Sequence, residues 1–187
     1  GGIPWIVDHK TGEKRNPTEK DLIEALRVMN QLPNLDIPCA LVYPSDYEPE
    51  ITQLKQTALM LKHCKKPIYT PGISAPSNVK YIVELFKLFG GEDVAHNPIG
   101  MTAVAADSPL CLAKNITDCT RMLVEAGIPT ALHAAPMAGL TGPLSVAGTV
   151  AQSHAEVLAF ACVAYLFNPE CVLIHGARPF FVNMKSA

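Results

Sequence analysis

The sequence predicts an α/β fold: part of a (β/α)₈ TIM barrel with parallel strands, in which about five βα units are visible. Three observations predict it. Short apolar runs rich in β-branched residues alternate with longer stretches of helical spacing. Successive runs begin 27 to 43 residues apart, which is long enough for a strand, a loop and a crossover helix. Polar residues gather directly after the runs, where barrel enzymes place their chemistry.

The expected elements alternate along the chain. Strands should begin near Cys39, Pro67, Met101, Ile128 and Cys171. Thr18, followed three residues later by Asp21, predicts the start of the first helix, and Pro33 predicts its end. Further helices are expected over residues 50–63, 77–89, 115–126 and 145–167. An open doubly wound sheet is the alternative architecture, but the dinucleotide fingerprint GxGxxG and the Walker loop are both absent.

The ends of the chain suggest an incomplete barrel. Residues 1–16 read as an N-terminal hairpin arm, and residues 17–187 as the first part of a truncated barrel. Five strands leave two sheet edges open. The helix over 145–167 is apolar on most sides, so it should pack against more than five strands. We therefore expect a longer parent protein and association into a homo-oligomer.

Composition narrows the classes of partner. A 49% hydrophobic and 17% charged chain suits strands that are buried on both faces. The net charge of −2 provides no basic field for nucleic acid. No uncharged apolar stretch has membrane length, and the charged N-terminus is unlike a signal peptide, so we expect a cytoplasmic protein without a membrane segment. The six cysteines form no CxxC or CxH pair, which indicates reduced thiols and no metal site.

The most distinctive segment is the loop over residues 135–148. Pro136, Gly139, Gly142 and Pro143 exclude a helix there. Glycines in such a loop let the backbone approach a ligand, and the N–H groups at the next helix start can bind an anion. The same composition would also suit a loop with a purely structural role. Such a loop would cover the barrel mouth, which is the end of the barrel formed by the loops that follow the strands.

This loop resembles the signature region of the trimethylamine methyltransferase family. The matching positions are Pro136 to Gly139, Thr141, Pro143, Ala147-Gly148 and Ala155 to Leu158. Other short matches follow in order: Asp8 with Thr11 to Arg15, Pro44-Ser45-Asp46, Lys66-Pro67, Gly90-Gly91-Glu92, Ser108-Pro109-Leu110 and Asn168-Pro169. The sequence departs from the family at Ser145-Val146, where Thr-Leu is more usual. It departs again over 183–187, where an acidic residue and an Arg are missing, and family members are more than twice as long.

The resemblance implies an enzyme that moves a methyl group from a small tertiary or quaternary amine, of the trimethylamine or glycine betaine type, to the Co(I) of a corrinoid protein. Such a reaction belongs to methanogenesis or one-carbon metabolism. The partner protein would carry the corrinoid (cobalamin), and this chain would bind none. The catalytic residues, including the pyrrolysine of the trimethylamine branch, would lie beyond Ala187.

A quaternary amine is a permanent cation without an acidic proton, so its site needs aromatic faces or carboxylates rather than a base or a metal. The candidate substrate-binding residues are Tyr43, Asp46, Tyr69, Asp107, His133, Met137, Gly139, Thr141 and His175. Asp46 and Asp107 could equally cap helices. His133 and His175 could be hydrogen-bonded core residues, or, at the mouth, His175 could bind a substrate carboxylate.

Other assignments stay open. Glu156 lies in a very apolar helix, where a bare charge is costly, so we expect it to have a polar partner. The rival functions are another TIM-barrel corrinoid or folate methyltransferase and a catalytically incomplete scaffold. A metal-dependent hydrolase is disfavoured because no His-x-His pair occurs. A Schiff-base lyase is disfavoured because Lys65 and Lys66 precede a strand instead of following one.

Overall fold

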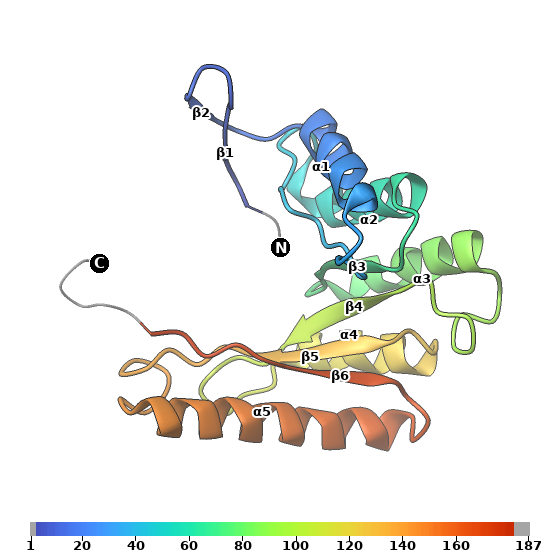
Figure 1. Cartoon of the computed structure of the whole chain (residues 1–187). Helices are drawn as coiled ribbons and strands as arrows, with labels where there is room; N and C mark the ends of the chain where they lie inside the picture. Colours follow the sequence, from blue (N-terminus) through green and yellow to red (C-terminus); the bar gives the residue numbers. More distant parts are fainter. Residues whose placement is uncertain (1–2, 182–187) are drawn as a thin grey trace. The chain divides into compact units, whose positions relative to one another are not determined.

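The computed structural model describes residues 3–181, which divide into two compact units. The first unit comprises residues up to 72 together with 80–102, and the second comprises 73–79 and the chain from 103 onward. Figure 1 shows the elements in chain order. Each unit is described separately below.

The first unit opens with an antiparallel hairpin of β1 (Ile6–Val7) and β2 (Lys14–Arg15). Gly12 makes the turn with a φ of 72°, a conformation that favours glycine. The hairpin agrees with the arm expected there. The division of the chain into residues 1–16 and 17–187 stays a prediction.

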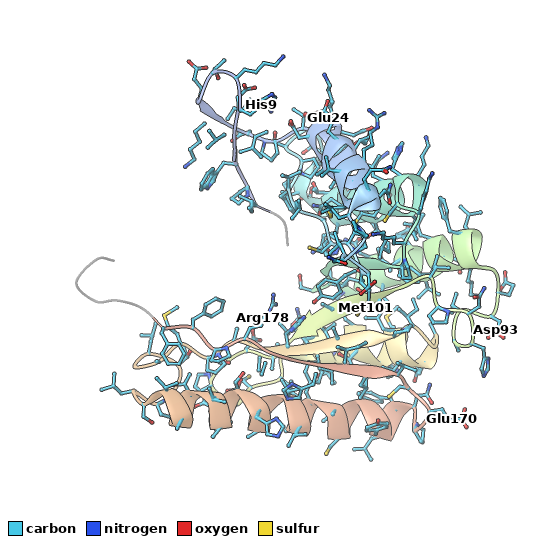
Figure 2. All side chains as sticks on the ribbon, in the orientation of Figure 1. His9, Glu24, Asp93, Met101, Glu170 and Arg178 are labelled. Atoms are coloured by element: carbon cyan, nitrogen blue, oxygen red, sulfur yellow. The ribbon has the colours of Figure 1, made fainter. Side chains whose placement is uncertain are left out.

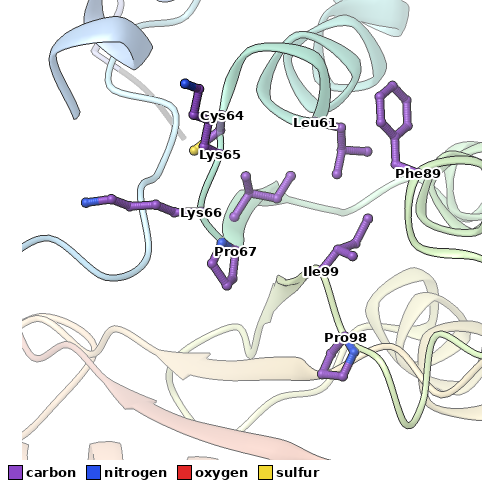
Figure 3. Close-up of a pocket in the computed structure, with 9 residues that line it drawn as sticks. Leu61, Cys64, Lys65, Lys66, Pro67, Phe89, Pro98 and Ile99 are labelled. Atoms are coloured by element: carbon purple, nitrogen blue, oxygen red, sulfur yellow. The ribbon is translucent and has the colours of Figure 1, made fainter. Parts of the chain in front are cut away.

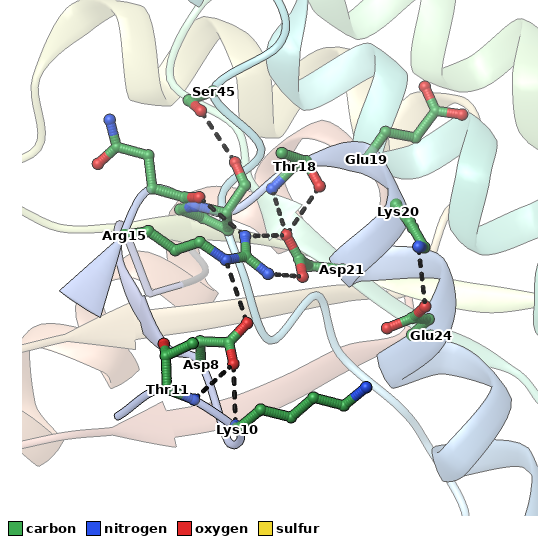
Figure 4. A network of polar contacts seen from close by, with 12 residues as sticks. Asp8, Lys10, Thr11, Arg15, Thr18, Glu19, Lys20, Asp21, Glu24 and Ser45 are labelled. Carbon is green, nitrogen blue, oxygen red and sulfur yellow. Dashed lines mark hydrogen bonds and ion pairs between the residues drawn. The ribbon is translucent and has the colours of Figure 1, made fainter. Parts of the chain in front are cut away.

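Helix α1 (Glu19–Gln31) begins where the sequence predicted. The Asp21 carboxylate accepts hydrogen bonds from the backbone N–H and the hydroxyl of Thr18, at 2.7 and 2.8 Å. The Arg15 guanidinium binds the same carboxylate with two nitrogens, at 2.8 and 2.7 Å (Figure 4). This bidentate bond, with those from Thr18, holds the pKa of Asp21 far below its usual range. The helix start therefore also fixes the end of the hairpin arm.

The core of the first unit lies between α1, α2 (Pro49–His63) and β3 (Ile68–Gly72), with buried Leu22, Leu26, Met60 and Ile68. The first expected strand, near Cys39, is only extended chain with two isolated parallel bridges, Cys39 to Tyr69 and Ile3 to Val42. The segment runs parallel to β3, as predicted for a strand of this sheet. Among the described residues, however, it forms isolated bridges instead of a regular ladder of backbone hydrogen bonds.

In the sequence of α2, helical periodicity places Ile51, Leu54, Ala58 and Leu61 on one apolar face and predicts that this face is buried, but the helix buries another side. Its buried residues are Thr52, Gln56, Thr57 and Met60. The Gln56 side-chain amide donates to the Val42 carbonyl at 2.8 Å, which satisfies a buried backbone acceptor. The apolar stripe that begins at Ile51 is left half-buried or exposed.

Two elements run from one unit into the other, α3 (Pro76–Gly90) and β4 (Gly100–Ala105). The second unit adds α4 (Lys114–Glu125), β5 (Thr130–Ala134), α5 (Val146–Phe167) and β6 (Leu173–Ala177). The sheet has the order β3-β4-β5-β6, and β5 and β6 are parallel. Strands in chain order with a helix between each pair confirm the predicted α/β class. The described residues form an open part of a barrel-like fold and not a closed barrel.

Helix α5 packs against β5, β6 and α4. By length and composition alone it is also long and apolar enough to cross a membrane. It nevertheless buries Glu156, Ser153 and Thr149 within the second unit. These polar contacts identify it as a helix of the α/β layers.

Candidate functional site

Glu156 joins the loops at the carboxyl ends of two strands of the second unit. Its side chain is 3% exposed. It accepts hydrogen bonds from the Ser108 hydroxyl at 2.6 Å and from the Leu110 N–H at 3.0 Å, both in the loop after β4. It also accepts one from the Gln152 side chain at 2.8 Å. The polar partner expected for this carboxylate is confirmed.

The loop after β5 is closed by its own hydrogen bonds. The Met137 carbonyl accepts from the N–H groups of Leu140, Thr141 and Gly142, at 3.0, 3.0 and 2.9 Å. The Met137 N–H donates to the Thr141 hydroxyl at 2.8 Å. Gln152 donates to the Thr141 carbonyl at 2.8 Å as well as to Glu156, so one side chain connects this loop to the carboxylate.

Local packing accounts for the glycines of this loop. Gly139 has a φ of 77°, which favours glycine. A Cβ on Gly148 would lie 2.8 Å from the Ser145 hydroxyl and 2.9 Å from Pro143 Cβ, closer than side chains tolerate. Ser145 caps α5 by accepting from the Gly148 N–H at 3.1 Å. The Pro-Gly pattern therefore builds a tight strand-to-helix connection.

His133 lies on β5 and is 7% exposed. Its Nδ1 is 2.7 Å from the Gly176 carbonyl, which can only accept, so Nδ1 carries the proton. Burial lowers the pKa of His133, the hydrogen bond to Gly176 opposes this shift, and the charge of Arg178 adds to it. Arg178 directly follows β6 (Figure 2). The imidazole is therefore neutral at pH 7.

His175 lies on the opposite face of the same sheet. In the parallel register His133 is paired with Gly176 and Leu132 with His175, so the two histidines point in opposite directions. His175 Nε2 is 2.8 Å from Nδ1 of His154 on α5, and the two rings are tilted by 46°. The carboxylate-binding role predicted for His175 required it to face the mouth, whereas its side chain contacts α5.

Asp107 follows β4 and is exposed. Its backbone pairs with Cys111 in both directions, at 2.9 and 3.0 Å. It does not cap α4, whose N-cap is Ala113. Within residues 3–181 no hydrogen bond or ion pair engages its carboxylate, which leaves a free anion at the strand's carboxyl end.

Three candidates belong to the first unit. Asp46 accepts a hydrogen bond from the Glu19 N–H in the first turn of α1, as the alternative helix-capping interpretation required. Tyr43 is half-buried, and its N–H donates to the Ile3 carbonyl at 3.0 Å. Tyr69, half-buried in β3, donates its N–H to the Pro38 carbonyl at 2.8 Å.

Within the second unit the structure thus brings together the loops that carry Asp107, Met137, Gly139 and Thr141. Sequence reasoning missed the connecting side chain, Gln152. The i, i+4 spacing of Gln152 and Glu156 was the available signal. It also missed His154, which no local pattern indicates.

A cavity of about 330 Å³ in the first unit lies at the amino end of β3, away from the strand's carboxyl end (Figure 3). It is lined by Leu61, Cys64, Lys65, Lys66, Pro67, Ile68, Phe89, Pro98 and Ile99. The Lys66 ammonium donates to the carbonyls of Leu32 and Leu35, at 2.5 and 2.6 Å. This lysine therefore holds the chain after α1. In the described part of the chain, no three His, Cys, Asp or Glu side chains are grouped to hold a metal ion.

Comparison with known proteins gives a family match over residues 1–187, to the model described as trimethylamine methyltransferase (MTTB). The chain is 23% identical over 183 residues to "Trimethylamine methyltransferase MttB" of Desulfitobacterium hafniense (strain DSM 10664 / DCB-2), covering 97% of this chain and 37% of that protein. It is 26% identical over 188 residues to "Glycine betaine methyltransferase" of Desulfitobacterium hafniense (strain Y51), covering 99% and 39%. It is 28% identical over 195 residues to "L-carnitine:corrinoid methyltransferase" of Eubacterium limosum, covering 98% and 40%. The chain thus spans less than half the length of these curated relatives.

Proposed function

Because the chain belongs to the trimethylamine methyltransferase family, we propose that its parent protein moves a methyl group from a small methylated amine to a corrinoid protein. The observation that carries the proposal is the family match over residues 1–187. The names of the three relatives support the substrate class, since each acts on a methylated amine, and one name includes the corrinoid acceptor. The partner carries the corrinoid, which supplies the Co(I) nucleophile, and this chain contributes to amine binding in the cytoplasm.

The chemistry of the candidate residues suits a cation without an acidic proton. Asp107 provides an exposed carboxylate that no described residue engages, and such a charge attracts an ammonium group. Because its pKa is lowered, His133 is neutral, and a neutral imidazole does not repel a cationic amine. In the first unit, considered by itself, Tyr43 and Tyr69 have aromatic rings of the kind that bind such a cation by cation–π contact, and their contact with substrate stays a prediction. Demethylation of a quaternary amine releases a neutral tertiary amine, so a substrate of that kind requires no general base from this chain.

The loop after β5 has the role of a rigid wall. Met137, Gly139 and Thr141 are held by the hydrogen bonds that close the loop. A rigid wall positions a methyl group for in-line attack without an entropic cost at the moment of reaction. Leu140 and Leu144 expose apolar side chains beside it, which suits the approach of a partner's macrocycle. We assign His175 no substrate contact, because it faces α5.

The test uses the intact parent protein, a reduced Co(I) corrinoid protein, and trimethylamine, glycine betaine and L-carnitine as separate substrates. Methylation of cobalt, followed by its visible absorption, is expected with one of them. Absence of cobalt methylation with every methylated amine would overturn the proposal. If a folate methyl donor alone supports methylation, the alternative barrel methyltransferase is correct.

A pair of carboxylate variants tests the role of Asp107. Asp107→Asn should raise KM for the amine at least about tenfold, since a neutral amide loses the attraction to a partly desolvated cation. Asp118→Asn removes an exposed carboxylate of α4 that pairs with Lys114, and it should leave KM unchanged. Equal KM values in the two variants would remove Asp107 from the site.

A further inference from the structure

The outer faces of α2 and α3 form an apolar groove within the first unit. It has a volume of about 390 Å³. Its lining residues are Ile51, Leu54, Lys55, Ala58, Tyr81, Glu84, Leu85 and Leu88. Leu88 is 77% exposed and Tyr81 51% exposed, so the groove presents large apolar side chains to solvent. Contiguous exposed apolar surface of this kind is typical of interaction sites.

The groove follows from the way α2 packs. This helix directs Thr52, Gln56 and Thr57 into the unit and leaves its stripe from Ile51 to Ala58 outside. Each inner polar side chain donates a hydrogen bond: Thr52 to the Glu48 carbonyl, Thr57 to the Gln53 carbonyl and Gln56 to the Val42 carbonyl. Among the described residues, the buried Gln56 Oε1 has no donor. The two threonine bonds lie within the helix, so they would survive its rotation, whereas the bond from Gln56 to Val42 of another segment would break. Gln56 therefore ties this orientation of α2, with its apolar stripe outward, to the core.

The two walls of the groove have the same pattern. The lining residues of α2 recur at i, i+3, i+4 and i+7 from Ile51, and those of α3 recur at the same spacing from Tyr81. Each wall has three uncharged residues and one central charge, Lys55 on α2 and Glu84 on α3. Among residues 3–181, the ion pair of Glu84 is a long contact of 3.9 Å with Lys87 of its own helix, and the Glu84 side chain is 72% exposed. Such a contact contributes little, so Glu84 can take a better partner.

We propose that this groove is the interface with a second copy of the same chain. Since both helices connect parallel strands, they run in the same direction. A two-fold axis along the groove then places α2 against α3 of the other copy, with apolar stripes facing each other. In this arrangement Lys55 meets Glu84 of the partner subunit, twice per dimer. A two-fold axis across the groove would place Lys55 against Lys55 of the partner subunit, and repulsion disfavours it.

Charge reversal in the intact protein tests this interface. Lys55→Glu and Glu84→Lys should each raise the dimer Kd at least about tenfold, because two like-charge pairs replace two opposite ones. The double variant Lys55→Glu with Glu84→Lys should restore the original Kd. Mixing the two single variants should produce a heterodimer in which every 55–84 pair is opposite in sign. Analytical ultracentrifugation over a concentration series measures each Kd.

Matched controls separate this interface from general effects. Lys20→Glu changes a lysine on α1 outside the groove, whose side chain is 83% exposed, and it should leave the Kd unchanged. Leu88→Asp should abolish dimers, and at concentrations below the dimer Kd it should leave the unfolding midpoint unchanged, since Leu88 is exposed. A monomer at every concentration, single variants that associate normally, or a mixture that forms no heterodimer would overturn the proposal. The outcome does not depend on whether the protein transfers methyl groups.

Discussion

The imidazole of His133 occupies the space where a side chain on Gly176 would begin. A Cβ on Gly176 would lie 1.9 Å from His133 Nδ1 and 2.2 Å from its Cε1. The two residues are paired across β5 and β6 and share a hydrogen bond. Gly176→Ala should therefore displace the ring and lower the free energy of unfolding by about 2–4 kcal/mol, the range for overpacking together with a lost buried hydrogen bond.

A double-mutant cycle checks this relationship. His133→Ala alone creates a cavity and is also destabilising, but in that background Gly176→Ala should cost less than about 1 kcal/mol. Urea unfolding of the four proteins gives the coupling. Additive effects would contradict the proposed steric conflict.

The lowered pKa of His133 predicts acid sensitivity. Below pH 6.5, the usual value for histidine, the unfolded chain binds a proton that the folded protein resists. The stabilisation from a neutral His133 is therefore complete above that pH and is lost as the pH falls below it. The urea midpoint should decline from about pH 7 to about pH 5, and His133→Gln should make the decline shallower. An identical slope in the two proteins would contradict the assignment.

Removing the Glu156 carboxylate should loosen two loops together. Glu156→Leu leaves the Ser108 hydroxyl, the Leu110 N–H and one Gln152 contact without their acceptor, so we expect a loss of about 2–4 kcal/mol. Amide hydrogen exchange should accelerate at Leu110 and at Thr141. Glu125→Leu changes an exposed carboxylate near the end of α4 and should leave both rates unchanged. Acceleration at Leu110 alone would show that the loops are independent.

The link between Arg15 and Asp21 should contribute to stability in a pH-dependent way. Because the pKa of Asp21 is held below its usual value of 3.8, its contribution is present above that pH and is lost under stronger acid. Arg15 is exposed and Asp21 half-buried, so solvent screens the pair in part, and Asp21→Asn should cost only about 1 kcal/mol at pH 7. Arg15→Met should remove much of the same energy, which a double-mutant cycle with chemical denaturation can measure.

The sequence predicted best what local chemistry determines. Thr18 and Asp21 mark the start of α1 because a capping box involves residues three apart. The strands β5 and β6 followed from apolar runs, and the loop after β5 followed from Pro136 and Gly139.

Tertiary contacts determine the rest. The buried side of α2 depends on the Val42 carbonyl, which Gln56 reaches from another segment, so hydrophobic periodicity alone pointed to the wrong face. The strand expected near Cys39 is incomplete in the described residues, because pairing there is limited to isolated bridges. The contact of His175 with His154 depends on how β6 lies against α5, over a separation of 21 residues. Apart from His175, whose side chain contacts α5, the substrate contacts of the candidate residues stay a prediction.

The shared carboxylate of Glu156 has a consequence for motion. The Leu110 N–H donates to Glu156, and Gln152 donates both to Glu156 and to the Thr141 carbonyl. A shift of the segment around Leu110 away from α5 therefore strains the hydrogen bonds that hold Thr141. The two segments should therefore fluctuate together, and a molecule that restricts the motion of one segment should also restrict the motion of the other.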